Sequence, residues 1–116
     1  MIGSIASGVV AVIHIYILVL EMFLWDTPRG RRVFGTTEAF ARESRVLAAN
    51  QGLYNGFLAA GLVWGIWLGE AGDGVKVFFL GCVAVAGIYG AITVNRRIAL
   101  VQIVPAAIAM ACVLFA

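Results

Sequence analysis

The sequence predicts an all-α protein, a bundle of four transmembrane helices. Its 116 residues are 63% hydrophobic and only 12% charged, and their mean hydropathy is +1.03. The apolar residues fall in four long stretches separated by short charged or turn-forming segments. A soluble chain of this size cannot bury so much apolar surface, so most of it needs the bilayer as its solvent. We therefore expect residues 1–116 to form a single integral membrane domain.

The four apolar stretches define the expected spans. The first ends at Asp26-Thr27-Pro28-Arg29-Gly30, a cluster of charged and helix-breaking residues. Each stretch is close to the length of about 20 residues that crosses a hydrocarbon core. The expected spans cover residues 2–25, 46–68, 75–94 and 98–116.

The long first loop is expected to be partly helical. Thr36 or Thr37 can cap a helix, with Glu38 near its positive N-terminal end. No proline or glycine occurs between Thr37 and Gln51, so this helix should run unbroken into the second span. The aromatic and basic side chains of the loop suit the headgroup layer of a membrane.

Loop charges predict the orientation of the bundle. Seven of the eight basic residues lie between the first and second or between the third and fourth spans, whereas the remaining loop carries Glu70, Asp73 and Lys76. By the positive-inside rule, loops 26–45 and 95–97 face the cytoplasm and both termini face outward (N-out/C-out). This predicts a multi-pass protein of the inner (cytoplasmic) membrane.

Small residues recur at the spacing that lets helices approach closely in lipid. The second span carries two such stripes and the third span one, namely Gly52, Gly56 and Ala60; Gly61, Gly65 and Gly69; and Ala86 and Gly90. Two stripes on one helix predict two contacts, one within the protomer and one between protomers of a homo-oligomer, a dimer or trimer.

Polar residues gather toward the cytoplasmic end of the spans and define a candidate site. His14 and Glu21 share one face of the first span, about 10 Å apart along the helix axis. We assign these two as candidate catalytic residues because buried ionisable groups in a membrane usually serve a function. The candidate ligand-binding residues are Asn50, Gln51, Tyr54, Asn55, Tyr89, Thr93 and Gln102. The opposite half holds little that is polar beyond Ser4 and Ser7.

Several of these residues also have structural interpretations. Glu21 could pair with His14 through an intervening polar group, or with Arg45 or Arg97. Tyr89 and Thr93 could be interfacial anchors or helix-end partners, Asn50 and Gln51 interhelical hydrogen-bond partners, and Pro105 a simple bend.

The chemistry of the candidate site stays open. A single histidine among mixed side chains argues against a metal site. Known hydrolase, phosphate-loop and dinucleotide motifs are missing, so the cofactor is unknown and the sequence does not decide whether a reaction is catalysed.

The sequence favours a protein that binds, and in one interpretation transforms, a small lipophilic molecule, with membrane lipids as its surroundings. In the enzymatic interpretation Glu21 or His14 would be the general acid or base. The alternatives are a small-solute or ion transporter or channel, and a structural subunit of a membrane complex. The net charge of +2 is too small to indicate nucleic acid.

The order of these motifs resembles a known family. HIYILVLEMFLW, TPRGRRVFG, NQGLYNGFLAAGL, VAGIYGAITV and QIVPA occur together. In this order they resemble a family of small bacterial integral membrane proteins of unknown function with four predicted spans. The resemblance covers nearly the whole chain and supplies no activity. It implies that the family signature includes His14, Glu21, Asn50, Gln51, Tyr54, Asn55 and Gln102.

The layout is also similar to that of the MAPEG proteins (membrane-associated proteins in eicosanoid and glutathione metabolism), four-span trimers with a basic first loop and an asparagine-bearing second helix. Of the Arg-x-x-x-Asn-x-x-Glu run on that helix, this chain has only Arg45 and Asn50, without a glutamate in register. The resemblance therefore implies an architecture and no catalytic role.

Overall fold

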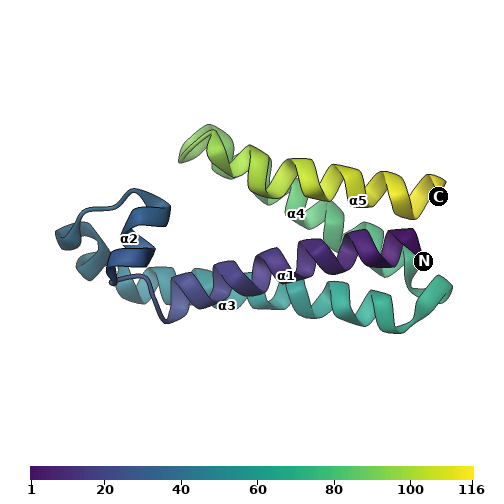
Figure 1. The fold of residues 1–116 in the computed structure, drawn as a ribbon, viewed down its shortest axis with the longest axis horizontal. Helices are drawn as coiled ribbons and strands as arrows, with labels where there is room; N and C mark the ends of the chain where they lie inside the picture. The colour runs from purple at the N-terminus through teal and green to yellow at the C-terminus, as the bar shows by residue number, and fades with distance from the viewer. The chain divides into compact units, whose positions relative to one another are not determined.

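The computed structural model describes residues 1–116 as an all-α chain, which confirms the predicted fold class (Figure 1). The helices, in order, are α1 (Ile2–Met22), α2 (Pro28–Phe34), α3 (Glu38–Trp67), the 3-10 helix η1 (Gly69–Gly72), α4 (Asp73–Thr93), the π-helix η2 (Ala99–Ile103) and α5 (Val104–Phe115). The chain forms two compact units. Unit 1 comprises Met1–Ile13 and Leu58–Ala116, and unit 2 comprises His14–Phe57.

Two segments are long and apolar enough to cross a membrane, by length and composition. They are Ile2–Met22 and Gly69–Thr93, with mean hydropathies of 2.2 and 2.0 in their most apolar windows. The apolar segment Ala99–Phe115 is shorter. The polar side chains of α3 lower its hydropathy. The four spans and their orientation therefore stay predictions.

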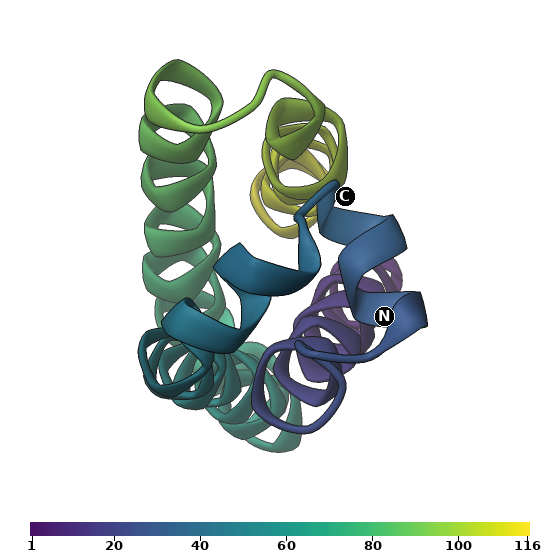
Figure 2. The ribbon, with the colours of Figure 1, turned by 90° about the vertical axis from the view of Figure 1, so that its left-hand side faces the viewer.

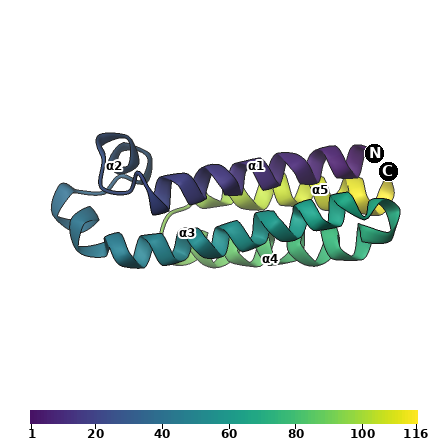
Figure 3. The same ribbon diagram turned by 90° about the horizontal axis from the view of Figure 1, so that it is seen from below.

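Unit 1 is built around an apolar core contributed by α1, α3, α4 and α5. Gly61 and Gly65 of α3 give α4 its close approach, since a Cβ on Gly61 would overlap the Phe79 ring. Figure 3 shows α3 turning through η1 directly into α4. The buried core residues are Val10, Ala11, Ala59, Leu62, Leu80, Val83, Ala106 and Ala109.

Helices α4 and α5 lie side by side in unit 1 (Figure 1), and Figure 2 shows the loop that joins them. Gly87 makes this contact possible, because a Cβ there would lie 2.8 Å from Ile103 Cγ1. Gly90 faces Ile98 in the same way. The expected pair of small residues, Ala86 and Gly90, was therefore wrong at its first member, since Ala86 is exposed.

The expected fourth helix, residues 98–116, is interrupted by a change of helix type. Its first turn is the π-helix η2, whose end is marked by a hydrogen bond from the Val104 N–H to the Ala99 carbonyl. Pro105 follows at the start of α5. Proline has no N–H and its ring crowds the carbonyl four residues earlier, and a wider turn relieves that crowding.

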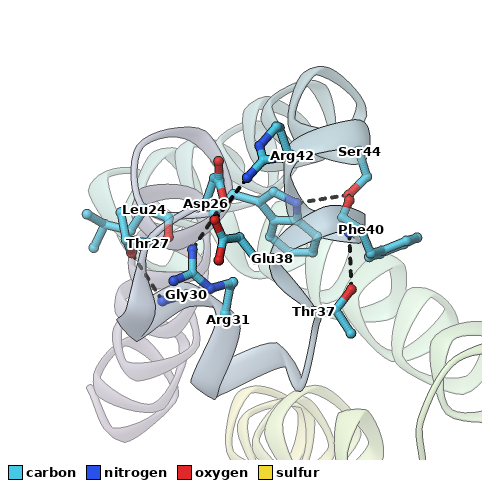
Figure 4. Close-up of polar contacts among 11 residues, drawn as sticks. Leu24, Asp26, Thr27, Gly30, Arg31, Thr37, Glu38, Phe40, Arg42 and Ser44 are labelled. Carbon is cyan, nitrogen blue, oxygen red and sulfur yellow. Dashed lines mark hydrogen bonds and ion pairs between the residues drawn. The ribbon is translucent and has the colours of Figure 1, made fainter.

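Unit 2 contains a short helix, α2, that was not predicted from the sequence. Thr27 caps it, because its Oγ1 accepts from the Gly30 N–H at 3.3 Å and donates to the Leu24 carbonyl at 2.6 Å. Gly35 ends it with a positive φ of 67°. Thr-Pro at a helix start is a cap followed by a proline that needs no N–H partner. The segment taken for a helix breaker therefore also starts a helix (Figure 4).

The start of α3 agrees with the sequence analysis. Of the two candidate caps, Thr37 acts, since its Oγ1 accepts from the Phe40 N–H at 3.1 Å. Glu38 lies in the first turn and pairs with Arg42 at 2.9 Å. The helix then runs without a break to Trp67, which confirms the predicted continuation into the second apolar stretch.

Replacing Gly30 with alanine should destabilise the chain. A Cβ at this position would overlap the backbone oxygen of Leu24, which cannot move aside as a side chain can. We expect a loss of about 3 kcal/mol in the free energy of unfolding, the upper end of the usual cost of overpacking. Unfolding in detergent, followed by circular dichroism, measures it.

Gly81→Ala is the matched control. A Cβ at Gly81 would meet no atom within 4 Å, and alanine favours a helix over glycine by roughly 0.5–1 kcal/mol. This variant should be slightly more stable than the parent. Equal stability of the two variants would contradict the packing of Gly30 against Leu24.

Candidate functional site

The centre of the candidate site is the carboxylate of Glu21, on the last turn of α1. Its side chain is 2% exposed. Oε2 accepts a hydrogen bond from Gln51 Nε2 at 2.9 Å, and Oε1 accepts one from Asn55 Nδ2 at 2.6 Å. Asn55 Nδ2 also donates to the Gln51 carbonyl at 3.3 Å. Two neutral amides, one helical turn apart on α3, thus hold the carboxylate through both oxygens.

Within unit 2 the donors to Glu21 are amides, and Arg45 is not its partner. Arg97 belongs to unit 1, so its pairing with Glu21 stays a prediction. Ion pairs join Arg31 to Asp26, Arg42 to Glu38 and Lys76 to Asp73. The basic side chains of the first loop that form ion pairs, Arg31 and Arg42, therefore pair with carboxylates that are close to them in the sequence. Such short-range pairs form without ordering long segments, whereas reaching the apolar helix would desolvate an arginine.

Glycines on α3 bring the two helices of this site together. A Cβ on Gly52 would lie 3.0 Å from Glu21 Cβ and 2.8 Å from Met22 Cγ. A Cβ on Gly56 would lie 2.6 Å from Leu18 Cδ1. Only residues without side chains allow this approach, and short amide side chains such as Asn55 can reach across it. The stripe predicted for helix packing thus also positions the site.

Both stripes of α3 are used within the chain. Gly52 and Gly56 face α1, and Gly61 and Gly65 face α4. The interpretation that one stripe joins two protomers is therefore not supported by these glycines, and Ala60, assigned to the first stripe, is exposed.

The other candidate residues of unit 2 differ in their surroundings. His14 is fully buried, on the same face of α1 as Glu21. Asn50 is exposed, and Tyr54, 59% exposed, packs edge-on against Phe57 with ring centroids 5.6 Å apart. Of the four polar residues that open the second span, the structure thus brings only Gln51 and Asn55 to Glu21.

The three remaining candidates, Tyr89, Thr93 and Gln102, belong to unit 1. Tyr89 is 71% exposed, and the Thr93 hydroxyl donates to the Tyr89 carbonyl at 2.7 Å within their own helix. Gln102 lies in the π-helix η2, where its Cβ would be 3.0 Å from a Cβ on Gly87. These contacts fit the structural interpretation of Tyr89 and Thr93 as residues at a helix end.

Side-chain contacts hold the segment that follows Glu21. Trp25 Nε1 donates to Ser44 Oγ at 3.0 Å, and the ring centroids of Trp25 and Phe34 lie 4.9 Å apart. Arg31 pairs with Asp26 at 3.2 Å (Figure 4). Trp25 thereby ties the end of the first apolar stretch to the start of α3, in the same unit as the Glu21 carboxylate.

Lys76, predicted to lie in a loop, is a buried polar group of a helix. It lies in α4 and is 3% exposed, with Nζ 3.0 Å from Asp73 Oδ1 and 3.3 Å from the Gly69 carbonyl. The expectation that the half away from the cytoplasm holds little beyond Ser4 and Ser7 was wrong at this residue. The Asp-x-x-Lys spacing, which places both side chains on one helix face, was the available signal.

Comparison with known proteins places the chain in a family. Residues 8–114 match the family described as "Protein of unknown function (DUF1304)". The chain belongs to the DUF1304 family. This confirms the resemblance to a family of unknown function. The DUF1304 chain is also 33% identical over 100 residues to the "Uncharacterized protein YpaA" of Lactococcus lactis subsp. lactis (strain IL1403), across 84% of each chain. No solved structure matches it significantly.

Replacing Asn55 with alanine should destabilise this DUF1304 protein. The change leaves a buried carboxylate oxygen without its 2.6 Å donor, at a cost of about 1–2 kcal/mol. Asn50→Ala is the matched control, because Asn50 is an exposed asparagine of the same helix, and it should leave stability unchanged. Thermal unfolding in detergent measures both. Equal effects of the two substitutions would contradict the assigned role of Asn55.

Proposed function

We propose that the chain is a multi-pass protein of the cytoplasmic membrane that binds a small lipophilic molecule at the Glu21–Gln51–Asn55 cluster. The observation that carries the proposal is a buried carboxylate held by neutral amides instead of a cation. A buried ionisable group is costly, so such a group in an apolar helix is a functional site by default.

The surface of the helices supports the membrane part of the proposal. Only 22% of the most apolar window of either candidate span is buried inside the protein. The core helix of a soluble protein would be mostly buried. Large apolar side chains such as Val12, Phe78 and Ile92 are 65%, 64% and 79% exposed. Extensive exposed apolar surface of this kind needs lipid or another protein to cover it.

The chemistry of the cluster indicates what kind of head group it would take. The amide N–H groups of Gln51 and Asn55 point at Glu21. Each amide also carries a carbonyl oxygen and the carboxylate has further lone pairs, whereas one N–H of Gln51 is left as a donor, so the remaining capacity is mostly that of an acceptor. A hydroxyl or amine head group would donate to these oxygens, and its apolar tail would lie along the exposed apolar faces. Gln51 is the exposed member of the cluster and marks the side of approach.

Glu21→Gln tests the binding site. The substitution keeps the size of the side chain but removes its charge and one acceptor oxygen. We expect the parent protein, extracted from membranes in a mild detergent, to carry a bound lipophile in native mass spectra, and the variant to lose it. The same spectra give the number of copies, for which the sequence predicts a dimer or trimer.

Glu43→Gln is the control, because Glu43 is an exposed glutamate of the same unit; it should keep the lipophile. A parent protein without a bound lipophile, or equal loss in both variants, contradicts the proposal. Unfolding of Glu21→Gln in detergent would make the cluster structural. Cation or proton flux in proteoliposomes, abolished by Glu21→Gln, would instead establish the transporter alternative, and an obligate co-purifying protein the subunit alternative.

The orientation can be tested with two single cysteines in a chain lacking Cys82 and Cys112. Arg32 is exposed in α2, and Gly74 has open space at its Cβ position. The charge distribution predicts that Gly74→Cys reacts with an impermeant maleimide on intact cells, and that Arg32→Cys reacts only after permeabilisation. The reverse pattern would overturn the orientation, and equal reaction of both in cell extracts without membranes would overturn the membrane location.

A further inference from the structure

Unit 1 contains a second polar site, separate in its residues from the Glu21 cluster. A cavity of about 670 Å³ opens where α3 turns through η1 into α4. Its size falls in the range of small-molecule sites, about 300–1,000 Å³. Its lining includes the polar residues Ser4, Glu70, Asp73 and Lys76, the apolar residues Ile66 and Val113, and the two ends of the chain, Met1 and Ala116.

Lys76 is the best-defined group in this cavity. Its stem is held by the close approach of α3, since a Cβ on Gly65 would lie 2.8 Å from Lys76 Cγ. The ammonium donates to Asp73 Oδ1 and to the Gly69 carbonyl. An ammonium has three N–H donors, so one donor is left after these two bonds. The buried stem and the two fixed bonds hold that remaining donor in place beside the cavity.

Carboxylates also line this cavity. Asp73 is half-exposed and already neutralises Lys76, whereas Glu70 is exposed and forms none of the chain's ion pairs. Among the lining side chains, Lys76 therefore offers one donor to an anionic group and Glu70 one carboxylate to a cationic group. An anion without a positive charge would be repelled by Glu70, and a cation without a negative charge would be repelled by Lys76. A group that carries both charges fits both.

We propose that this cavity binds the head group of a zwitterionic amphiphile that carries an amine and a phosphate, as phosphatidylethanolamine does. The phosphate accepts from Lys76, the ammonium faces Glu70 and Asp73, and the apolar part lies along Ile66 and Val113. The site rests on the membrane location proposed above for its supply of lipid, but it shares no residue with the Glu21 cluster.

A binding titration tests this site. The parent protein in detergent is titrated with short-chain phosphatidylethanolamine, and adducts are counted by native mass spectrometry. We expect saturable binding of one lipid per chain. Lys76→Met keeps the buried stem and removes the donor, so its Kd should rise about tenfold or more, the usual effect of losing one charge-assisted hydrogen bond. Lys76→Arg should restore most of the affinity.

Glu70→Gln tests the amine contact without disturbing a buried group. It should weaken binding of phosphatidylethanolamine and leave that of phosphatidylglycerol, which lacks the amine, unchanged. Arg96→Met is the matched control, since it removes a cation from an exposed position in the same unit; it should bind as the parent does. Glu21→Gln should also bind as the parent does, which separates this site from the one proposed above.

Two results would overturn the proposal. One is equal affinity of the parent, Lys76→Met and Arg96→Met, and the other is equal parent affinity for phosphatidylethanolamine and phosphatidylglycerol. Glycerophosphoethanolamine, the same head group without tails, distinguishes the source of the ligand. If this compound binds much more weakly than phosphatidylethanolamine, the ligand is a lipid. If the two bind equally, the lipid proposal is wrong and the ligand is a soluble zwitterion. If Lys76→Met fails to fold, two measurements still test the proposal: the selectivity of Glu70→Gln between the two lipids and the affinity of Lys76→Arg for phosphatidylethanolamine.

Discussion

The close approach of α3 to its neighbours is the constraint on which the rest of the structure depends. At Gly52 and Gly56 it meets the second half of α1, and at Gly61 and Gly65 it meets the start of α4. At the membrane location proposed above, helices gain no hydrophobic energy by meeting, so the packing of backbones across small residues would hold them together. At Gly52, for example, a Cβ would lie 3.0 Å from Glu21 Cβ, so a side chain there would crowd the helix that carries the carboxylate.

The two buried charged groups of the chain both depend on this approach. Glu21 reaches the amides of Gln51 and Asn55 because Gly52, which lies between these two residues in α3, leaves room for α1 to approach. Lys76 is buried because Gly65 leaves room for its stem. The partners of the two groups differ. Lys76 has a carboxylate nearby and is neutralised, whereas the amides that donate to Glu21 are neutral. This difference makes Glu21 the stronger candidate for exchange of a ligand or proton.

The candidate site could be predicted only in part. The apolar stretch and the seven-residue spacing made Glu21 and His14 candidates, and the four-residue spacing placed Gln51 and Asn55 on one face. The same reasoning included Asn50 and Tyr54, which are exposed on α3. Four neighbouring polar residues cover about a third of a helix, and the sequence alone does not say which part of that arc faces α1. Lys76 was assigned to a loop because charge in an apolar segment usually marks its end.

The sequence by itself determined the helical class, the family, a cap at Thr36 or Thr37 and the uninterrupted course of α3, because these depend on composition and on contacts between near neighbours. The tertiary structure alone decided which small residues touch, Gly87 instead of Ala86, and which partners the buried charges take. It also decided that Pro105 is preceded by a π-turn. These features depend on which face of one helix is turned toward the other. Successive residues of a helix point about 100° apart, and no local pattern determines which of them faces the neighbouring helix.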